Sequence, residues 1–135
     1  MKQVVILFFG LMLTTNILLA QRGEFMERPP EERAEIQTKI MTYALALSDS
    51  SRIDNVHDIN LKYARKMEKL TDGDSNRRVK FRKMRSLSED KDNDLKKALT
   101  SEQYEEYLAL KEQWRERLID EMQKRREEKN GNHAF

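Results

Sequence analysis

The stretch that decides the fold is Leu99-Thr100-Ser101-Glu102-Gln103, which separates two long helical patterns. A threonine followed three residues later by a glutamine is a capping box. The Thr100 hydroxyl accepts a hydrogen bond from the Gln103 amide, and the Gln103 side chain returns to the Thr100 backbone. The stretch therefore predicts a corner at which one helix ends and the next begins.

A weaker form of this pattern occurs earlier in the chain, as Leu47-Ser48-Asp49-Ser50-Ser51. Here too a leucine precedes a hydroxyl residue, and serine is a good N-cap, so Ser48 is expected to begin a helix. A corner at each copy predicts two helical hairpins. We therefore expect an elongated all-α fold of four helices.

Outward from the two corners, apolar residues recur at spacings of three and four, which places them on one face of a helix. The expected helices cover residues 30–47, 49–70, 77–99 and 101–128, with a loop at 71–76. Their expected apolar faces are Ile36, Ile40, Tyr43, Ala44 and Leu47; Ile53, Val56, Asn60, Tyr63, Met67 and Leu70; Val79, Phe81, Met84, Leu87, Leu95 and Ala98; and Tyr104, Tyr107, Leu108, Leu110, Trp114, Leu118 and Met122.

Residues 1–20 have the pattern of a secretory signal peptide, with Lys2 at the start, an apolar run at 4–13 and a small residue at Ala20. We expect cleavage after Ala20, export to the periplasm and no stable membrane insertion afterwards. An uncleaved membrane anchor is the alternative, because the run is near the lower length limit for a bilayer span.

The remaining chain is expected to be one domain: a flexible arm at 21–29, helices at 30–129 and a frayed tail at 130–135. It contains no cysteine, so its stability must come from helix packing. Charged residues make up 37% of the chain, which leaves a thin apolar seam that dimerisation would help to bury.

Composition also argues against several functions. With 26 basic and 24 acidic residues the charge is nearly balanced, which disfavours a dedicated nucleic-acid binder. The only histidines are His57 and His133, and no nucleophile constellation or glycine-rich phosphate loop is visible. Weak chelation by His57 with Asp54 or Asp58 is the alternative to a simple surface histidine. We therefore expect no enzyme activity, no cofactor and no metal.

The most informative surface is the basic stretch 77–85, which carries six cations and no acid. Positive charge at a helix N-terminus opposes the helix dipole, so local stability does not require it. One interpretation is a surface that attracts acidic, partly unfolded chains and offers them apolar contact. The other is a solvated helix face whose apolar members belong to the core. The candidate client-binding residues are Arg77, Arg78, Val79, Phe81, Arg82, Met84 and Arg85, together with Ile36 and Ile40.

The residues from Leu99 to Gln103 match the LTxxQ motif, and the chain resembles the Spy/CpxP family of periplasmic helical proteins over about residues 30–120. The copy at 47–51 keeps the leucine but has serine in place of both threonine and glutamine. The order of signal peptide, arm and four helices is also similar. The structural motif residues are Leu47, Ser48, Leu99, Thr100 and Gln103.

The resemblance implies a cradle-like antiparallel homodimer whose concave face holds unfolded clients through apolar and basic residues. The expected function is that of an ATP-independent periplasmic chaperone or envelope-stress protein, whose partners are unfolded or partly folded envelope proteins. Other members of the family restrain a sensor kinase through its periplasmic domain, which is the first alternative. A structural coiled-coil adaptor is the second.

Overall fold

The computed structural model describes residues 25 and 27–131. It contains four α-helices and, in this described part, no strand: α4 (Pro30–Ala44), α5 (Ser50–Asp72), α6 (Arg77–Ala98) and α7 (Ser101–Gly131). The predicted all-α fold of four helices is confirmed. The expected signal peptide at 1–20, and parts of the expected arm and tail, lie outside the described residues.

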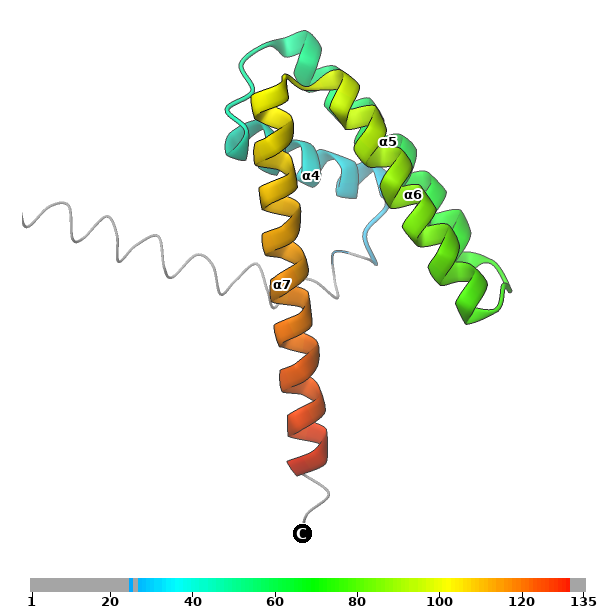
Figure 1. Cartoon of the computed structure of the whole chain (residues 1–135). Helices are drawn as coiled ribbons and strands as arrows, with labels where there is room; N and C mark the ends of the chain where they lie inside the picture. Colours follow the sequence, from blue (N-terminus) through cyan, green and yellow to red (C-terminus); the bar gives the residue numbers. More distant parts are fainter. Residues whose placement is uncertain (1–24, 26, 132–135) are drawn as a thin grey trace, which may run out of the picture.

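The helices form two arms that diverge from one corner (Figure 1). Helices α5 and α6 lie side by side along one arm, and α4 packs on α5 near the corner. Helix α7 forms the other arm and contacts α4 and α6 only through its first turns. Helix α6 therefore packs along α5, whereas the sequence analysis expected it to pair with the last helix.

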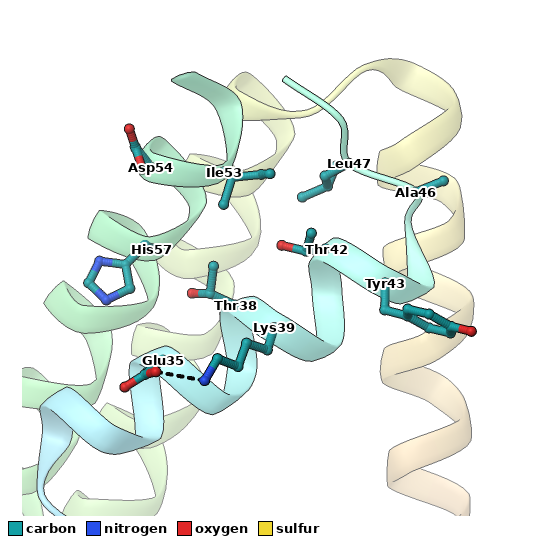
Figure 2. Close-up of a pocket in the computed structure, with 10 residues that line it drawn as sticks. All are labelled: Glu35, Thr38, Lys39, Thr42, Tyr43, Ala46, Leu47, Ile53, Asp54 and His57. Carbon is teal, nitrogen blue, oxygen red and sulfur yellow. Dashed lines mark hydrogen bonds and ion pairs between the residues drawn. The ribbon is translucent and has the colours of Figure 1, made fainter. Parts of the chain in front are cut away.

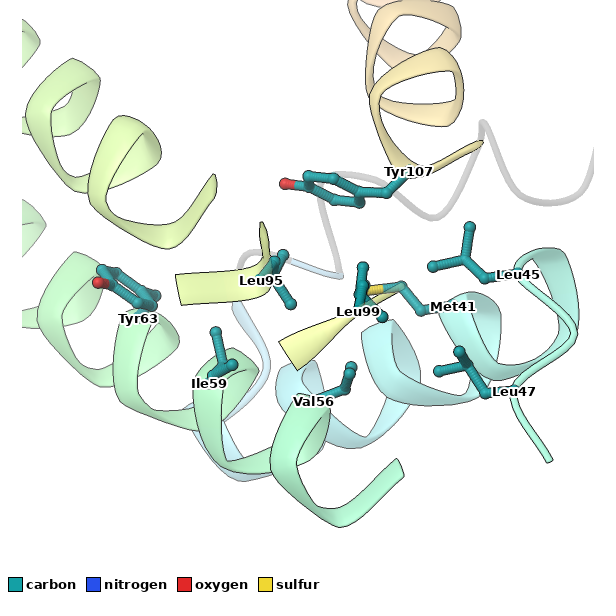
Figure 3. Close-up of a cluster of buried hydrophobic side chains, with 9 residues drawn as sticks. All are labelled: Met41, Leu45, Leu47, Val56, Ile59, Tyr63, Leu95, Leu99 and Tyr107. Atoms are coloured by element: carbon teal, nitrogen blue, oxygen red, sulfur yellow. The ribbon is translucent and has the colours of Figure 1, made fainter. Parts of the chain in front are cut away.

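The core lies at this corner and draws on all four helices and both connecting loops (Figure 3). The leucines of the two expected corners are both buried, Leu47 with 6% and Leu99 with 7% of its surface exposed. The full cluster consists of Met41, Leu45, Leu47, Val56, Ile59, Tyr63, Leu95, Leu99 and Tyr107.

The first corner differs from its prediction: the first helix ends three residues before the expected Leu47, and the cap of the second lies one residue after the expected Ser48. Helix α4 ends at Ala44, and Ala46 takes a left-handed backbone conformation with φ of 48°. This reversal brings Leu47 back into the core. The N-cap of α5 is Asp49, whose side chain accepts from the Ser51 amide at 3.1 Å. The expected cap, Ser48, is exposed; a carboxylate at this position also complements the positive end of the helix dipole.

The apolar face predicted for the first helix is wrong. Ile36 and Ile40 are only half-buried, Ala44 is exposed and Tyr43 has 92% of its surface exposed. The residues that face α5 are two positions away in sequence, on the opposite side of the helix: Ala34, Thr38, Met41 and Leu45. The small Ala34 allows close helix packing, and Thr38 supplies a hydrogen bond to the buried Asn60.

The other helix ends lie close to their predicted positions. Helix α5 continues to Asp72, so the loop is 73–76, and the Asn76 side chain caps α6 by accepting from the Arg78 amide at 3.1 Å. Helix α6 ends at Ala98 and α7 extends to Gly131. Residues 130 and 131, expected in the frayed tail, are therefore helical.

Candidate functional site

The basic stretch forms an exposed surface at the tip of the α5–α6 arm, away from the core. Phe81 has 68% and Met84 has 38% of its surface exposed. Val79 is half-buried. We call the exposed group the basic surface; its members are Arg77, Arg78, Phe81, Arg82, Met84 and Arg85.

Positive charge dominates this surface. The one ion pair that its residues form with other described residues joins Arg85 Nε to Glu89 at 3.2 Å. Both partners are exposed, so solvent screens the attraction and the pair contributes little to stability. The neutral amide of Asn76, and not a carboxylate, caps the helix at this end. Most of the positive charge of the basic surface is therefore not neutralised by the described residues and can attract an external partner.

The structure does not bring Ile36 and Ile40 to the basic surface. Gln37, which lies between them in sequence, accepts a hydrogen bond from Lys91 Nζ at 2.9 Å. Lys91 is further along α6 toward the corner than any residue of the basic surface. The nine candidate client-binding residues therefore do not form one surface: six form the basic surface, Val79 is half-buried, and Ile36 and Ile40 lie apart on α4.

The predicted capping box at the second corner is confirmed. The Thr100 backbone N donates to Gln103 Oε1, and the Gln103 backbone N donates to Thr100 Oγ1, both at 3.2 Å. Arg52 of α5 also donates to Gln103 Oε1 at 3.2 Å. With Leu99 buried beneath it, this motif joins α5, α6 and α7 at one point.

Sequence reasoning missed the polar seam between α4 and α5. Asn60 is fully buried, and its Nδ2 donates to Thr38 Oγ1 at 3.0 Å, while Thr38 in turn donates to the Ala34 carbonyl at 2.7 Å. Asn60 Oδ1 has no hydrogen-bond partner in the part of the chain that the structure describes. Arg33, also buried, reaches the Ala64 carbonyl at 3.5 Å. A buried polar group is costly unless it is paired, so this seam favours one register of α4 on α5.

A second polar cluster fastens the start of α7 to α6. Asp92 accepts from the Tyr107 hydroxyl at 2.7 Å and from the Lys111 ammonium, which also donates to Ser88 at 3.1 Å. Burial, with help from Asp92, raises the pKa of Tyr107 and keeps its hydroxyl protonated as a donor. The cluster holds α7 at a fixed angle to α6 beyond the corner.

Lys91, next to this cluster, is a second ionisable group whose pKa is shifted by burial. Burial lowers the pKa of Lys91 to about 8, although the neighbouring Asp92 carboxylate acts in the opposite direction and Lys111 adds to the lowering. Its hydrogen bond to Gln37 links α6 to α4. No sequence signal distinguished Lys91 and Asp92 from the many other charged residues of this helix.

An open hollow of ≈650 Å³ lies between the C-terminal half of α4 and the start of α5 (Figure 2). Glu35 and Lys39 pair across its lower edge at 2.7 Å, and Tyr43 lies at its rim. Its lining consists of Glu35, Thr38, Lys39, Thr42, Tyr43, Ala46, Leu47, Ile53, Asp54 and His57. The charges of this hollow are mixed in sign, unlike those of the basic surface.

Two further observations concern the described residues as a whole. No three histidine, cysteine, aspartate or glutamate side chains among them come together in a way that could hold a metal ion. None of the four described helices combines the length and the apolar character that crossing a membrane requires.

The family described as "Domain of unknown function (DUF4890)" matches residues 20–107, more than half of the chain, and the chain belongs to this family. The matched span includes α4, α5, α6 and the first turns of α7. Comparison with curated proteins and with solved structures found no match.

Proposed function

We propose that this chain is an ATP-independent periplasmic chaperone, acting in envelope stress, that binds unfolded or partly folded proteins at the basic surface. The observation that carries the proposal is the exposure of Phe81 and Met84 among four arginines that other described residues leave largely unneutralised. Scattered apolar residues on a protein surface are ordinary. Apolar side chains surrounded by positive charges suit a partner that is both acidic and incompletely folded.

Capture and retention would use different members of this surface. The arginines attract acidic chains over a distance and raise the association rate. Phe81 and Met84 then contact apolar segments that a folded client would bury; methionine adapts to irregular partners because it is flexible and polarisable. Binding of this kind is reversible and needs no nucleotide.

The test is the capture of a denatured acidic client by the mature chain without ATP. Replacing Arg77, Arg78, Arg82 and Arg85 with glutamine should slow association roughly tenfold at low salt, since steering charges raise on-rates. The matched control replaces four exposed α7 cations with glutamine: Lys124, Arg125, Arg126 and Lys129. The difference between the two variants should vanish near 1 M salt, where the Debye length falls to about 3 Å.

A second variant separates retention from capture. Replacing Phe81 and Met84 with serine should speed client release while leaving the association rate close to that of the parent. The proposal fails if the parent does not suppress client aggregation, or if the arginine variant captures clients as fast as the parent at low salt. A chain that binds one folded sensor domain and leaves the client to aggregate would instead fit the kinase-restraining role.

We also propose that the active form is a cradle-like antiparallel homodimer. The distal part of α7 carries Ile119 and Met122 with 45% and 49% of their surfaces exposed. A second copy of the chain would cover such residues and add the burial that a small core lacks.

Light scattering over a range of concentrations should give a dimer mass for the parent and a lower mass after replacement of Ile119 and Met122 with serine. A monomeric parent would overturn the proposal, and a stable dimer without client binding would favour the adaptor role.

The periplasmic location rests on the pattern of residues 1–20. We expect export, cleavage after Ala20 and a mature chain that begins at Gln21. Mass spectrometry of the soluble periplasmic fraction tests this expectation. Recovery of the full-length chain only from membranes would contradict it.

A further inference from the structure

We propose that the tip of the α5–α6 arm carries a second binding site, a groove for the phosphate groups of anionic phospholipids. The groove has a volume of ≈360 Å³ and lies between the end of α5 and the first half of α6. We call it the lysine groove; it is lined by Lys66, Lys69, Leu70, Lys83, Ser86 and Leu87. Its residues are not among the six of the basic surface, although Lys83 belongs to the basic stretch 77–85, and its proposed ligand is a lipid phosphate rather than an unfolded chain.

The charges of the lysine groove are not neutralised. Its lining contains three lysines and no acid, and no ion pair between described residues involves Lys66, Lys69 or Lys83. Lys66 lies over the Tyr63 ring at 5.2 Å, a contact that leaves its charge intact. The same seam nearer the corner is compensated, because Lys62 pairs with Asp94 at 2.8 Å. Uncompensated charge is therefore confined to the tip end of the α5–α6 seam.

This arrangement fits a phosphate group. Three lysines from two helices line this one groove, and a bound anion would be attracted by all three charges. Lysine binds phosphate as a compact point charge with three donors, and the Ser86 hydroxyl adds one more donor. The lining therefore contains ammonium and hydroxyl donors for a phosphate and no competing carboxylate.

The remaining lining favours a phospholipid over a free anion. Leu70 and Leu87 are half-buried in the groove and supply an apolar wall beside the lysines. A lipid headgroup continues into its glycerol and acyl chains, which can use that wall, whereas inorganic phosphate cannot. The groove lies at the end of the arm, where the chain can approach a flat membrane surface. Association of this kind is peripheral and adds electrostatic attraction for an anionic leaflet to a small apolar contact.

Vesicle binding by the mature chain tests the proposal. The parent should bind phosphatidylcholine vesicles that contain phosphatidylglycerol, and binding should weaken as salt rises. Replacing Lys66, Lys69 and Lys83 with glutamine should weaken it about 100-fold, given the usual contribution of three basic residues at an anionic surface. The matched control replaces Lys124, Arg126 and Lys129 with glutamine and should bind within about threefold of the parent because these residues lie on the other arm.

Three results would overturn the proposal: equal binding of the parent to pure phosphatidylcholine, equal losses in the groove and control variants, or complete displacement by inorganic phosphate at matched ionic strength. The last would identify a free anion as the ligand. Circular dichroism must show parent-like helix content in the groove variant. If the helix content of the groove variant is lower, the single variant Lys83→Gln replaces it. In addition, soluble short-chain phosphatidylglycerol must then shift the NMR signals of residues 66, 69 and 83 of the parent. Captured clients should leave the groove variant at the parent's rate, because Phe81 and Met84, which hold the client, are unchanged; this release rate separates the proposal from the chaperone activity.

Discussion

The truncation Leu99→Ala tests whether the second corner organises the fold. Leu99 is the C-cap residue of α6, has 7% of its surface exposed and packs in the cluster to which all four helices contribute. The substitution removes three carbons from a nearly closed site, which costs about 2.4 kcal/mol in transfer free energy at roughly 0.8 kcal/mol per buried CH₂. The cavity left behind adds to this loss, so we expect a decrease of about 3 kcal/mol in the free energy of unfolding.

Urea denaturation followed by circular dichroism measures this loss, at several protein concentrations so that any dimer equilibrium is separated from folding. The matched control is Leu108→Ala on α7, since Leu108 has 36% of its surface exposed. The control should lose less than about 1 kcal/mol because exposed leucines contribute little to burial. A loss below about 1 kcal/mol for Leu99→Ala, or equal losses for the two variants, would refute the claim that this corner organises the core.

Three further predictions address the polar features. Thr100→Ala should lower the free energy of unfolding by about 1 kcal/mol, the usual cost of losing a hydroxyl N-cap, and urea melts that show no change would contradict this role. Thr38→Val should cost about 1–3 kcal/mol because it leaves the buried Asn60 amide with only the weak acceptor Met41 Sδ, whereas Thr38→Val with Asn60→Leu should be close to neutral. Thermal melts in which the double variant is less stable than Thr38→Val alone would refute the role of this seam. Burial lowers the pKa of Lys91 to about 8 from its ordinary 10.5, so between these values the unfolded chain binds more protons and stability should rise with pH. Urea melts between pH 7.5 and about 9.5, below the range where tyrosines ionise, should show this rise in the parent and not in Lys91→Met.

The features predicted correctly from the sequence are those set by neighbouring residues. The capping box depends on a threonine and a glutamine three residues apart, and it forms as predicted. The ends of α5 and α6 follow from loop-forming residues between them and lie within two residues of their predicted positions. The face of α5 was also predicted, since Val56, Asn60 and Tyr63 are all buried. Only Ile59 was missing from that buried group.

The face of α4 could not be predicted from spacing alone. Ile36, Ile40 and Tyr43 follow the same spacing as Ala34, Thr38 and Met41, displaced by two residues. Both sets therefore form a stripe, on opposite sides of the helix. The more apolar stripe is the outward one, because the choice depends on contacts with a distant segment: close packing at the alanine and the hydrogen bond to Asn60.

The side-chain contacts that fix the helices relative to one another could not be predicted from the sequence either. Asp92 is one of several acids in α6, and nothing in its local pattern indicates that Tyr107 and Lys111 will meet it. The lysine groove likewise forms only because Lys83 of α6 comes beside Lys66 and Lys69 of α5. The exposure of Phe81 and Met84 was part of the client-binding hypothesis, and the structure describes both side chains as exposed.

The position of the core at one end of two arms has a mechanical consequence. Helix α7 has 31 residues, which at 1.5 Å per residue make a lever about 46 Å long. A rotation of about 10° at Leu99 and Thr100 displaces its far end by about 8 Å over a helix of that length. A small change in the backbone torsion angles of these two residues would therefore cause a large change in the distance between the far ends of the two arms. The contacts of Asp92 with Tyr107 and Lys111 restrain this rotation, so they fix the distance between the far ends of the two arms.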